Sequence, residues 1–363
     1  MAHGEAGRTR PALRETGELE TLLSIADGVG VNGLARLLAR HKLRILCYHG
    51  FSYADEHRFR SGLFMAPETF RYRMETLARE GYRVLGLEDA LRRVSEGSLQ
   101  RDSVVLTFDD GWQGIADFAV PVLRQYGFPA TIYVTSYYVT TQIPVVNILV
   151  PYIFWKAPAG VVDASRILPG RAGNFNLGDP HARQDLSRRV IDYCDRELPP
   201  DERLAVCREC ALALGVDIDF VDRGGFRLMN EASLGRIADE GFDIQLHSHR
   251  HRGTVGPQSQ TTYEVERNRQ VLRECSKTPL VHSCYPGGRY SPDQINVLRE
   301  LGIVSATTTQ PGLADRSTSH FELPRFLDDE NLSQAKFKAI VSGFWSAIRS
   351  LEPSKLGPRR RHE

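Results

Sequence analysis

Short apolar segments alternate along the chain with longer segments whose apolar residues recur every three or four positions. The short segments, rich in β-branched residues, predict strands, and the periodic ones predict helices. Pro67–Gly81 is typical of the helices, because Pro67 lies in its first turn and Gly81 ends it. The predicted strands are Arg44–Tyr48, Ser103–Phe108, Ala130–Thr135, Phe242–Leu246, Val281–Tyr285, Ile303–Thr308 and Phe321–Phe326.

Strand and helix follow one another seven or eight times, which predicts an α/β fold with a parallel sheet covered by helices. That number of units favours a closed barrel over an open sheet. No G-x-G-x-x-G follows an early strand, which disfavours a dinucleotide-binding fold. In parallel barrels the functional side chains lie at the carboxyl ends of the strands. The other main predicted helices are Asp117–Tyr126, Asn230–Glu240, Thr262–Ser276, Pro292–Leu301 and Asn331–Ser350.

The same pattern divides the chain into regions. Residues 1–40 form an amino-terminal extension, residues 41–330 the barrel, and residues 331–363 a closing helix with a basic tail. The alternation breaks at about 137–225, which we interpret as an insertion. It begins with the aromatic-rich run Ile143–Trp155, cut by two prolines. We favour packing of this run against the barrel; the alternative is a wall over the functional site, or a surface for a lipid-linked ligand.

The charges are nearly balanced, since 46 basic and 45 acidic residues give a net charge of +1. This predicts no general affinity for nucleic acid or anionic membranes, and Arg359–Arg361 is interpreted as a solvated tail. Six cysteines are too few for a disulfide framework. Cys207 and Cys210 lie in a predicted helix, where packing is the expected role. No apolar leader or membrane-spanning run is visible, so we expect a cytoplasmic protein. The oligomeric state is left open.

Two groups of ionisable residues follow predicted strands. Asp109 and Asp110 come directly after Ser103–Phe108, and His247, His249 and His251 come after Phe242–Leu246. One carboxylate with two histidines is a common catalytic zinc set, and a second carboxylate can take a proton from water. A remaining histidine can protonate a leaving group. The pattern therefore predicts metal-assisted hydrolysis, although an Asp-Gly turn and a solvated histidine loop are the simpler alternatives.

Two further features lie at strand ends. His49 follows the first strand, and the Pro-Gly-Gly turn at Pro286–Gly288 follows the strand Val281–Tyr285. A rigid turn of this kind exposes backbone N–H groups that could receive an oxyanion, but such turns are common and weak as a signal.

These motifs resemble a known family. Thr107–Gly111, His247–His251 and Tyr285–Gly288 are similar to the signature blocks of the polysaccharide deacetylases, carbohydrate esterase family four. The resemblance runs from about residue 45 to about residue 326, in the expected order and spacing. Tyr48–Gly50 and Leu323–Arg325 resemble the subgroup that includes exopolysaccharide deacetylases. The resemblance implies an irregular barrel of about seven βα units.

The resemblance also implies residue roles. Asp109 matches the catalytic base, and Asp110, His247 and His251 match the metal ligands. Gly287 matches the position whose backbone N–H helps to hold the oxyanion.

The chain departs from the family pattern at three places. Cys284 stands where the family often carries arginine, and Arg325 is a candidate replacement for that arginine. Gly287 stands where a bulky aromatic residue is usual, so one wall of the sugar site is missing. No late Leu-x-His block supplies the acid; the subgroup points to His49, with His320 as the weaker candidate.

By this resemblance we expect a metal-dependent hydrolase that removes N-acetyl groups from an amino-sugar glycan or glycolipid and releases acetate. The expected cofactor is a divalent ion, Zn²⁺ first, with Co²⁺ or Ni²⁺ as alternatives. The partner is an N-acetylated carbohydrate, without nucleic acid and without a transmembrane segment. The alternatives are a related amidohydrolase acting on a formyl or non-sugar amide, and a non-catalytic sugar-binding relative.

Overall fold

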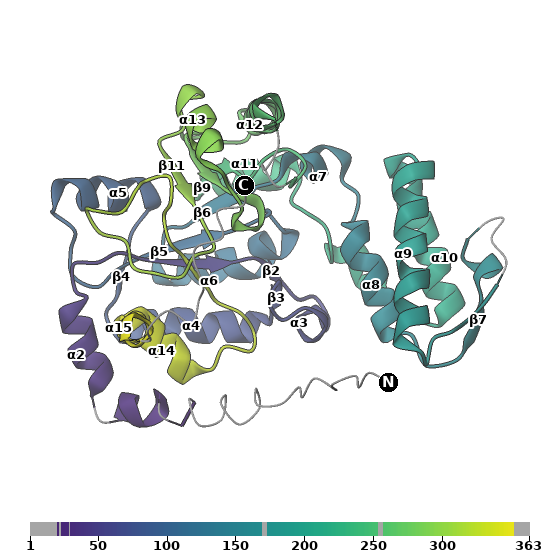
Figure 1. Cartoon of the computed structure of the whole chain (residues 1–363), viewed down its shortest axis with the longest axis horizontal. Coiled ribbons are helices and arrows are strands. Elements are labelled where there is room, and N and C mark those ends of the chain that lie inside the picture. Colours follow the sequence, from purple (N-terminus) through teal and green to yellow (C-terminus); the bar gives the residue numbers. More distant parts are fainter. Residues whose placement is uncertain (1–19, 22, 29, 169–172, 253–256, 352–363) are drawn as a thin grey trace, which may run out of the picture.

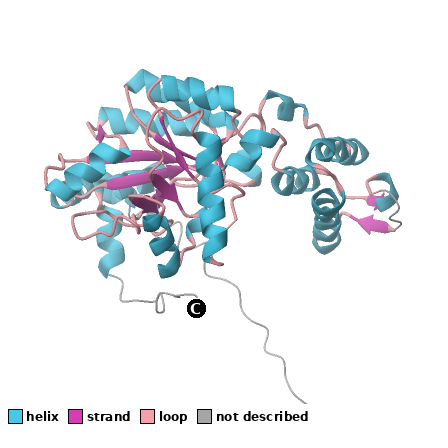
Figure 2. Ribbon diagram, turned by 90° about the horizontal axis from the view of Figure 1, so that it is seen from above, coloured by secondary structure: helices cyan, strands magenta, loops and turns pink. Residues whose placement is uncertain are grey.

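The computed structural model describes residues 20–351, apart from 22, 29, 169–172 and 253–256. At its centre an eight-stranded parallel sheet curls into a half-barrel (Figure 1 and Figure 2). This confirms the predicted α/β class of the deacetylase barrel type, although the sheet stays open between β11 and β12 where the number of units favoured a closed barrel. The strands are β1 (Arg44–Tyr48), β4 (Arg83–Val84), β5 (Ser103–Phe108), β6 (Thr131–Val134), β9 (Asp243–Leu246), β10 (His282–Cys284), β11 (Ser305–Thr307) and β12 (Phe326–Leu327).

The strand order is β11-β10-β9-β6-β5-β1-β12, and β4 pairs with the first residues of β5. Every residue of β1, β5 and β6 is buried, as expected for parallel strands covered on both faces. On the outer face, Leu46, Leu106 and Ile132 share one apolar cluster with residues of the surrounding helices. These helices are α4 (Pro67–Arg79), α6 (Val120–Tyr126), α11 (Glu231–Asp239), α12 (Gln258–Leu272) and α13 (Pro292–Glu300).

One helix, α5 (Leu87–Glu96), covers the inner face of the sheet instead. Leu91 and Val94 of this helix form a second apolar cluster with Ile45, Val105 and Tyr133, which point inward. Because side chains alternate along a strand, the residues two and four positions beyond Ile45 and Val105 also point inward. The helix therefore fills the half-barrel where the strands begin. At the carboxyl ends of the strands, the inner face is occupied instead by the side chains that follow Ile45 and Val105 in this alternation, such as His49 and Asp109. Neither β4 nor α5 is among the predicted elements.

The segment 320–327 links the two edges of the curled sheet. Leu323 forms a bridge with Thr307 of β11, and Phe326 pairs with Leu46 of β1. Only Phe326, the last residue of the predicted strand Phe321–Phe326, lies in β12. The earlier part of this segment bridges to β11 through Leu323 instead of pairing with β1. The crossing places the side chain of Arg325 inside the half-barrel, where it is fully buried.

The insertion is mainly helical and stands beside the barrel in Figure 1. The run Ile143–Trp155 forms most of one helix that continues through Pro151, although proline costs the helix one backbone hydrogen bond. Leu149, Ile153 and Phe154 are buried in the main apolar cluster, which favours the packing interpretation. The elements are α8 (Val146–Lys156), β7 (Val161–Asp163), β8 (Asn174–Asn176), α9 (Pro180–Glu197) and α10 (Arg203–Leu214).

The carboxyl-terminal region contains two helices, so the single predicted helix Asn331–Ser350 is wrong. Gly343 separates α14 (Gln334–Ser342) from α15 (Phe344–Leu351) with a φ of 89°, a conformation that glycine adopts without strain. A Cβ at this glycine would lie 2.7 Å from the Cβ of Ala39, so the position also permits a close approach. The arginines Arg359–Arg361 lie outside the described residues. Among the described helices, none has the length and apolar character needed to cross a bilayer.

Candidate active site

The predicted site residues meet at the carboxyl ends of three strands. Asp109 and Asp110 follow β5, His247 follows β9, and His49 follows β1. In the strand order, β5 pairs with both β1 and β6, and β6 pairs with β9. The carboxyl ends of parallel strands lie at one edge of a sheet, so residues more than a hundred positions apart come together there.

Asp110, His247 and His251 form a set that fits a metal ion. The Nε2 atoms of His247 and His251 each lie 3.4 Å from Oδ1 of Asp110, and the three ligand atoms lie within 4.8 Å of one another. A tetrahedral ion with bonds of about 2.0–2.1 Å places neighbouring ligand atoms about 3.3–3.4 Å apart. The residues therefore fit a tetrahedral ion with an open position, with almost no change in the carboxylate–imidazole spacing.

Hydrogen bonds orient these side chains. Nδ1 of His247 lies 2.9 Å from the carbonyl oxygen of Cys284, which fixes the ring so that Nε2 faces Asp110. Nε1 of Trp112 donates to Oδ2 of Asp110 over 2.8 Å, which leaves Oδ1 for a metal. Asn268 of α12 accepts from the backbone N–H of His247, so that helix holds the residue in place.

Backbone strain is concentrated at and beside this set. Asp110, Ser248 and His251 have φ values of 70°, 62° and 52°, in the left-handed region that side chains other than glycine rarely adopt. They are half of the six such residues that the described part of the chain contains. Each costs about 1–3 kcal/mol, so the packing around this set holds it against its local preference, as is common at functional sites.

Asp109 lies deeper and is paired with Arg325. The guanidinium donates two hydrogen bonds of 2.7 Å, one to each carboxylate oxygen, and the side chains of Arg325 and Asp109 are 0% and 4% exposed. Arg325 also donates to the carbonyl of Thr308 over 2.9 Å and to Oγ1 of Thr107 over 3.1 Å. Burial raises the pKa of Asp109, but the charge and hydrogen bonds of Arg325 outweigh it and hold this pKa well below its usual range.

Asp110 is likewise held in its ionised form. Burial raises its pKa, while the hydrogen bond from His247 and the neighbouring imidazoles lower it, and the net pKa lies well below the usual range. Both adjacent carboxylates are therefore anionic at neutral pH, each with its own cationic or hydrogen-bonding neighbours.

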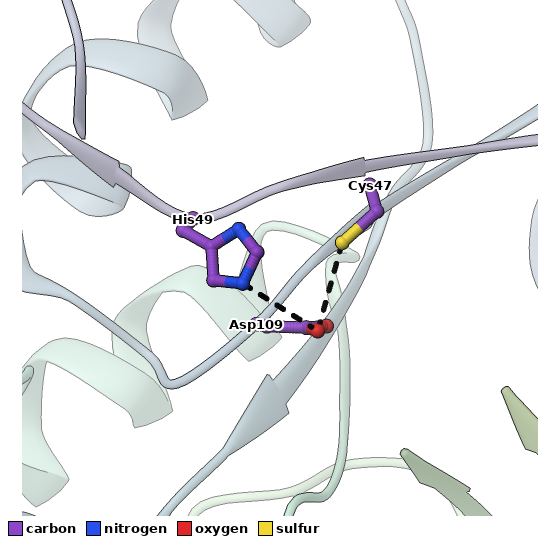
Figure 3. A group of neighbouring side chains, drawn as sticks. All are labelled: Cys47, His49 and Asp109. Atoms are coloured by element: carbon purple, nitrogen blue, oxygen red, sulfur yellow. Dashed lines mark hydrogen bonds and ion pairs between the residues drawn. The ribbon is translucent and has the colours of Figure 1, made fainter. Parts of the chain in front are cut away.

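His49 lies beside Asp109, whereas His320 does not. Nε2 of His49 lies 3.9 Å from Oδ2 of Asp109, and the ring is directed toward this carboxylate (Figure 3). The side chain is 19% exposed, so it is also accessible to solvent. His320 contacts Ser95 in the last turn of α5, 3.3 Å away, at the end of the half-barrel that α5 fills. Of the two candidate acids, the structure brings only His49 next to Asp109.

The Pro-Gly-Gly turn follows β10 as predicted. Gly287 has a φ of 61°, and a Cβ there would have no atom within 4 Å, so the position where an aromatic wall was expected is open space. Gly288 is crowded instead, because a Cβ there would clash with the side chain of Thr309. Cys284 touches both members of the buried pair, at 3.3 Å from Oδ2 of Asp109 and 3.0 Å from Nη2 of Arg325. Arg325 therefore supplies a guanidinium beside Cys284, the position where the family often carries arginine.

Some residues that shape the site were not found from the sequence. Trp112 belongs to the same short motif as Asp110, and its position two residues later was the available signal. Glu264 is buried and accepts hydrogen bonds of 2.7 Å from the backbone N–H and from Nε of Arg250, which anchors the histidine loop. Glu264 and Asn268 lie four residues apart in α12 and therefore on one face of the helix. Two polar residues at this spacing in a predicted helix were the available signal for a contact with the site. His249 is 7% exposed and hydrogen-bonded to Ser136, so the idea that it lies in a solvated loop is wrong.

The chain matches the sequence model of the family described as Polysaccharide deacetylase at residues 96–163 and 219–306. The interval between these ranges contains the insertion helices α9 and α10. The chain is 33% identical over 303 residues to YxkH of Bacillus subtilis (strain 168), a protein assigned as a polysaccharide deacetylase. That alignment covers 83% of this chain and 76% of YxkH.

Solved structures share the fold. The deacetylase PplD of Streptococcus pyogenes, determined in complex with acetate, is 17% identical with a TM-score of 0.53, over 86% of this chain and 99% of PplD. IcaB from Ammonifex degensii is 14% identical with a TM-score of 0.51, over 83% of this chain and 96% of IcaB. The likeness to these structures defines the fold as an α/β half-barrel. The relationship to YxkH, together with the match to the family model, shows that the chain belongs to the polysaccharide deacetylase family and is a deacetylase of the hydrolase class.

Proposed function

We propose that this protein is a metal-dependent N-deacetylase of an amino-sugar glycan or glycolipid and that it releases acetate. The observation that carries the proposal is the juxtaposition of two sets of residues. Asp110, His247 and His251 converge at metal-ligand spacing, and the adjacent Asp109 is ionised and held by Arg325. A sugar-binding relative without activity would not need the second carboxylate.

Asp110, His247 and His251 would hold the ion, for which we propose Zn²⁺, with Co²⁺ or Ni²⁺ as alternatives. The donor set of one carboxylate and two imidazoles suits these ions better than Mg²⁺ or Ca²⁺, which prefer oxygen ligands. When bound, such an ion supplies a lowered pKa for a water molecule and polarisation of the acetyl carbonyl.

Asp109 would accept the proton of the attacking water. The guanidinium of Arg325 keeps this carboxylate ionised and fixes both of its oxygens, so the base is oriented but weak. A weak base can take a proton only from a water whose pKa is lowered. Asp109 would therefore depend on an ion held by the neighbouring residues Asp110, His247 and His251.

His49 would donate a proton to the departing amine, which is a poor leaving group without it. Its ring lies 3.9 Å from Asp109 and is partly exposed, so it can reach both the base and a bound substrate. The backbone N–H of Gly287, in the left-handed turn after β10, would donate to the oxyanion of the tetrahedral intermediate.

The substrate class is proposed from the family, and the acetate bound to the deacetylase PplD agrees with acetyl as the group removed. The open space at Gly287 removes one expected wall of the sugar site and suits a bulky or branched glycan.

The test is a substrate screen with the purified protein and added Zn²⁺. Acetate and free amine should appear from N-acetylglucosamine oligomers, whereas matched N-formyl oligomers should release no formate and acetylated peptides no acetate. Turnover of the formyl or peptide amides alone would instead support the related amidohydrolase.

A further inference from the structure

Three sets of ligand-bearing side chains converge among the residues that the structure describes. The first, Asp110 with His247 and His251, is the proposed catalytic metal set. The second, Asp109 with His247 and Cys284, shares His247 with the first, so the two cannot both be filled. The third, Cys47 with His49 and Asp109, shares no residue with the first. It can therefore be occupied while the catalytic ion is in place.

We propose that Cys47, His49 and Asp109 form a second, inhibitory site for a thiophilic divalent cation. Figure 3 shows the thiol of Cys47 and the ring of His49, at the end of β1, directed toward the same carboxylate. Sγ of Cys47 lies 3.6 Å and Nε2 of His49 lies 3.9 Å from Oδ2 of Asp109.

These spacings suit a tetrahedral ion with one sulfur ligand. With a metal–sulfur bond of about 2.3 Å and a metal–oxygen bond of about 2.0 Å, the sulfur and oxygen atoms lie about 3.5 Å apart. The thiol of Cys47 is already at this distance from Asp109. The imidazole of His49 has to move by about 0.5 Å, since a nitrogen–oxygen spacing of about 3.3–3.4 Å is needed. Its partly exposed ring can make that movement, and it gives the ion an entry from solvent.

Arg325 decides which ions this site accepts. It already donates to both oxygens of Asp109, and the thiol of Cys284 also donates to Oδ2 over 3.3 Å. A thiol is a weak donor, and that of Cys284 has the carbonyl oxygen of Tyr285 as an alternative acceptor 3.8 Å away, so the second lone pair of Oδ2 can be given to a metal. The fixed positive charge repels a dication, so a neutral thiol would not suffice. On binding, the Sγ–H bond of Cys47 breaks, the proton leaves to water, and an Sγ–metal bond forms. The site therefore selects Zn²⁺, Co²⁺ or Cd²⁺ and rejects Mg²⁺ and Ca²⁺.

The consequence is inhibition by excess zinc, a conclusion that rests on the proposed function. An ion at this site would occupy the proposed base and the proposed acid together while leaving the catalytic ligands untouched. One equivalent of Zn²⁺ would then activate the protein, and a second would inhibit it.

The binding test does not depend on activity. Metal-free protein, kept reduced, is titrated with Co²⁺ and followed by absorption spectroscopy and metal analysis. The first equivalent should give visible bands without a thiolate contribution, and the second should add a near-ultraviolet thiolate-to-Co²⁺ charge-transfer band. Cys47→Ser should lose that band and the second equivalent. His247→Ala with His251→Ala should lose the first equivalent and keep the band.

Matched controls come from other buried thiols. Cys284→Ser removes the thiol on the opposite side of Asp109, and Cys207→Ser removes one in the insertion; both should keep the band. A band that persists in Cys47→Ser, or that disappears in Cys284→Ser, would overturn the proposal, as would the absence of a second equivalent. Cys47→Ala serves as the second variant if the serine at this buried position prevents folding.

The inhibition test uses each variant's own activity at one equivalent of Zn²⁺ as its reference. The inhibitory Zn²⁺ concentration should rise at least about tenfold in Cys47→Ser, because even the loss of an outer partner of a ligand weakens metal binding by 10–100-fold. Mg²⁺ and Ca²⁺ should not inhibit. If no substrate is found, the Co²⁺ result still decides the second site; if the protein is active but zinc inhibits Cys47→Ser unchanged, the inhibitory role is wrong.

Discussion

Asp109 and Asp110 are neighbours in the sequence and both are buried, yet their side chains have different neighbours. Asp109 belongs to what we call the floor of the site, the buried group of Asp109, Arg325, Cys47 and Cys284, in which the fully buried Arg325 neutralises its charge. Asp110 faces the rim, where the side chain of His251 is 44% exposed. The left-handed backbone at Asp110, with a φ of 70°, turns the two side chains in different directions.

The difference separates two tasks. On the floor, Asp109 and Arg325 form an ion pair that needs no metal to stay ionised. The desolvation penalty of this pair and its mutual attraction both contribute to the free energy of folding. The rim consists of the proposed ligands Asp110, His247 and His251, whose relative positions are set by strained backbone and by hydrogen bonds. Because His251 is partly exposed, an ion held there can exchange with solvent. If this division is correct, substitutions on the rim should affect metal content, and substitutions on the floor should affect stability and turnover.

The largest effect is expected at the rim. The double variant His247→Ala, His251→Ala should lose the ion and with it turnover, because only one of the three proposed ligands remains. Elemental analysis of the dialysed protein measures the ion, with His249→Ala as a control that removes a neighbouring imidazole outside the set. Metal content equal to that of the wild type would show that these histidines do not hold the ion.

On the floor, Asp109→Asn should retain the ion and lose turnover by a factor on the order of a hundred or more, because the general base is removed. Acetate release should be measured below the unfolding transition of the variant, together with its metal content. Near-normal turnover would mean that Asp109 only orients its neighbours.

The next comparison concerns stability without metal. Asp109→Asn leaves the guanidinium of Arg325 buried without its counter-ion, which should lower the free energy of unfolding by about 3–5 kcal/mol. Asp110→Asn can keep the hydrogen bond from Trp112. This substitution should therefore change the free energy of unfolding by no more than about 1 kcal/mol. Urea unfolding of both variants with a chelator present measures the difference.

The double variant Asp109→Asn, Arg325→Met is the control. Replacing the buried charge by an apolar side chain should recover much of the loss. Equal destabilisation by the two single variants would remove the distinction between floor and rim.

The sequence predicts these elements unequally well. The bounds of β1 and β5 agree with the prediction to the residue, because a short apolar run buried on both faces has few other solutions. The two ligand groups were found because each is a local motif after a strand. By contrast, α5 was missed although Leu87, Ala90, Leu91 and Val94 show clear helical spacing, and Gly343 was not recognised as a break between helices.

Contacts between distant segments were harder to predict. Arg325 was named as a candidate from the family pattern, but its two bonds to Asp109 depend on how 320–327 crosses the open side of the sheet. The contribution of Asn268 and Glu264 likewise depends on which face of α12 meets the histidine loop. No local spacing encodes these placements, because they follow from the curl of the sheet.

His49 tests the boundary between floor and rim, since it touches Asp109 and is also open to solvent. If it is the general acid, His49→Ala should retain the ion and lose amide hydrolysis by a factor on the order of a hundred, while an activated aryl ester, whose leaving group needs no proton, should be affected much less. The ratio of the two rates measures the acid role directly, because a merely misplaced base would slow both substrates alike. His320→Ala is the matched control, and its contact with Ser95 places it away from the site. Equal losses on amide and ester in His49→Ala would make His49 a positioning residue for Asp109, and a selective amide defect in His320→Ala would move the acid role there.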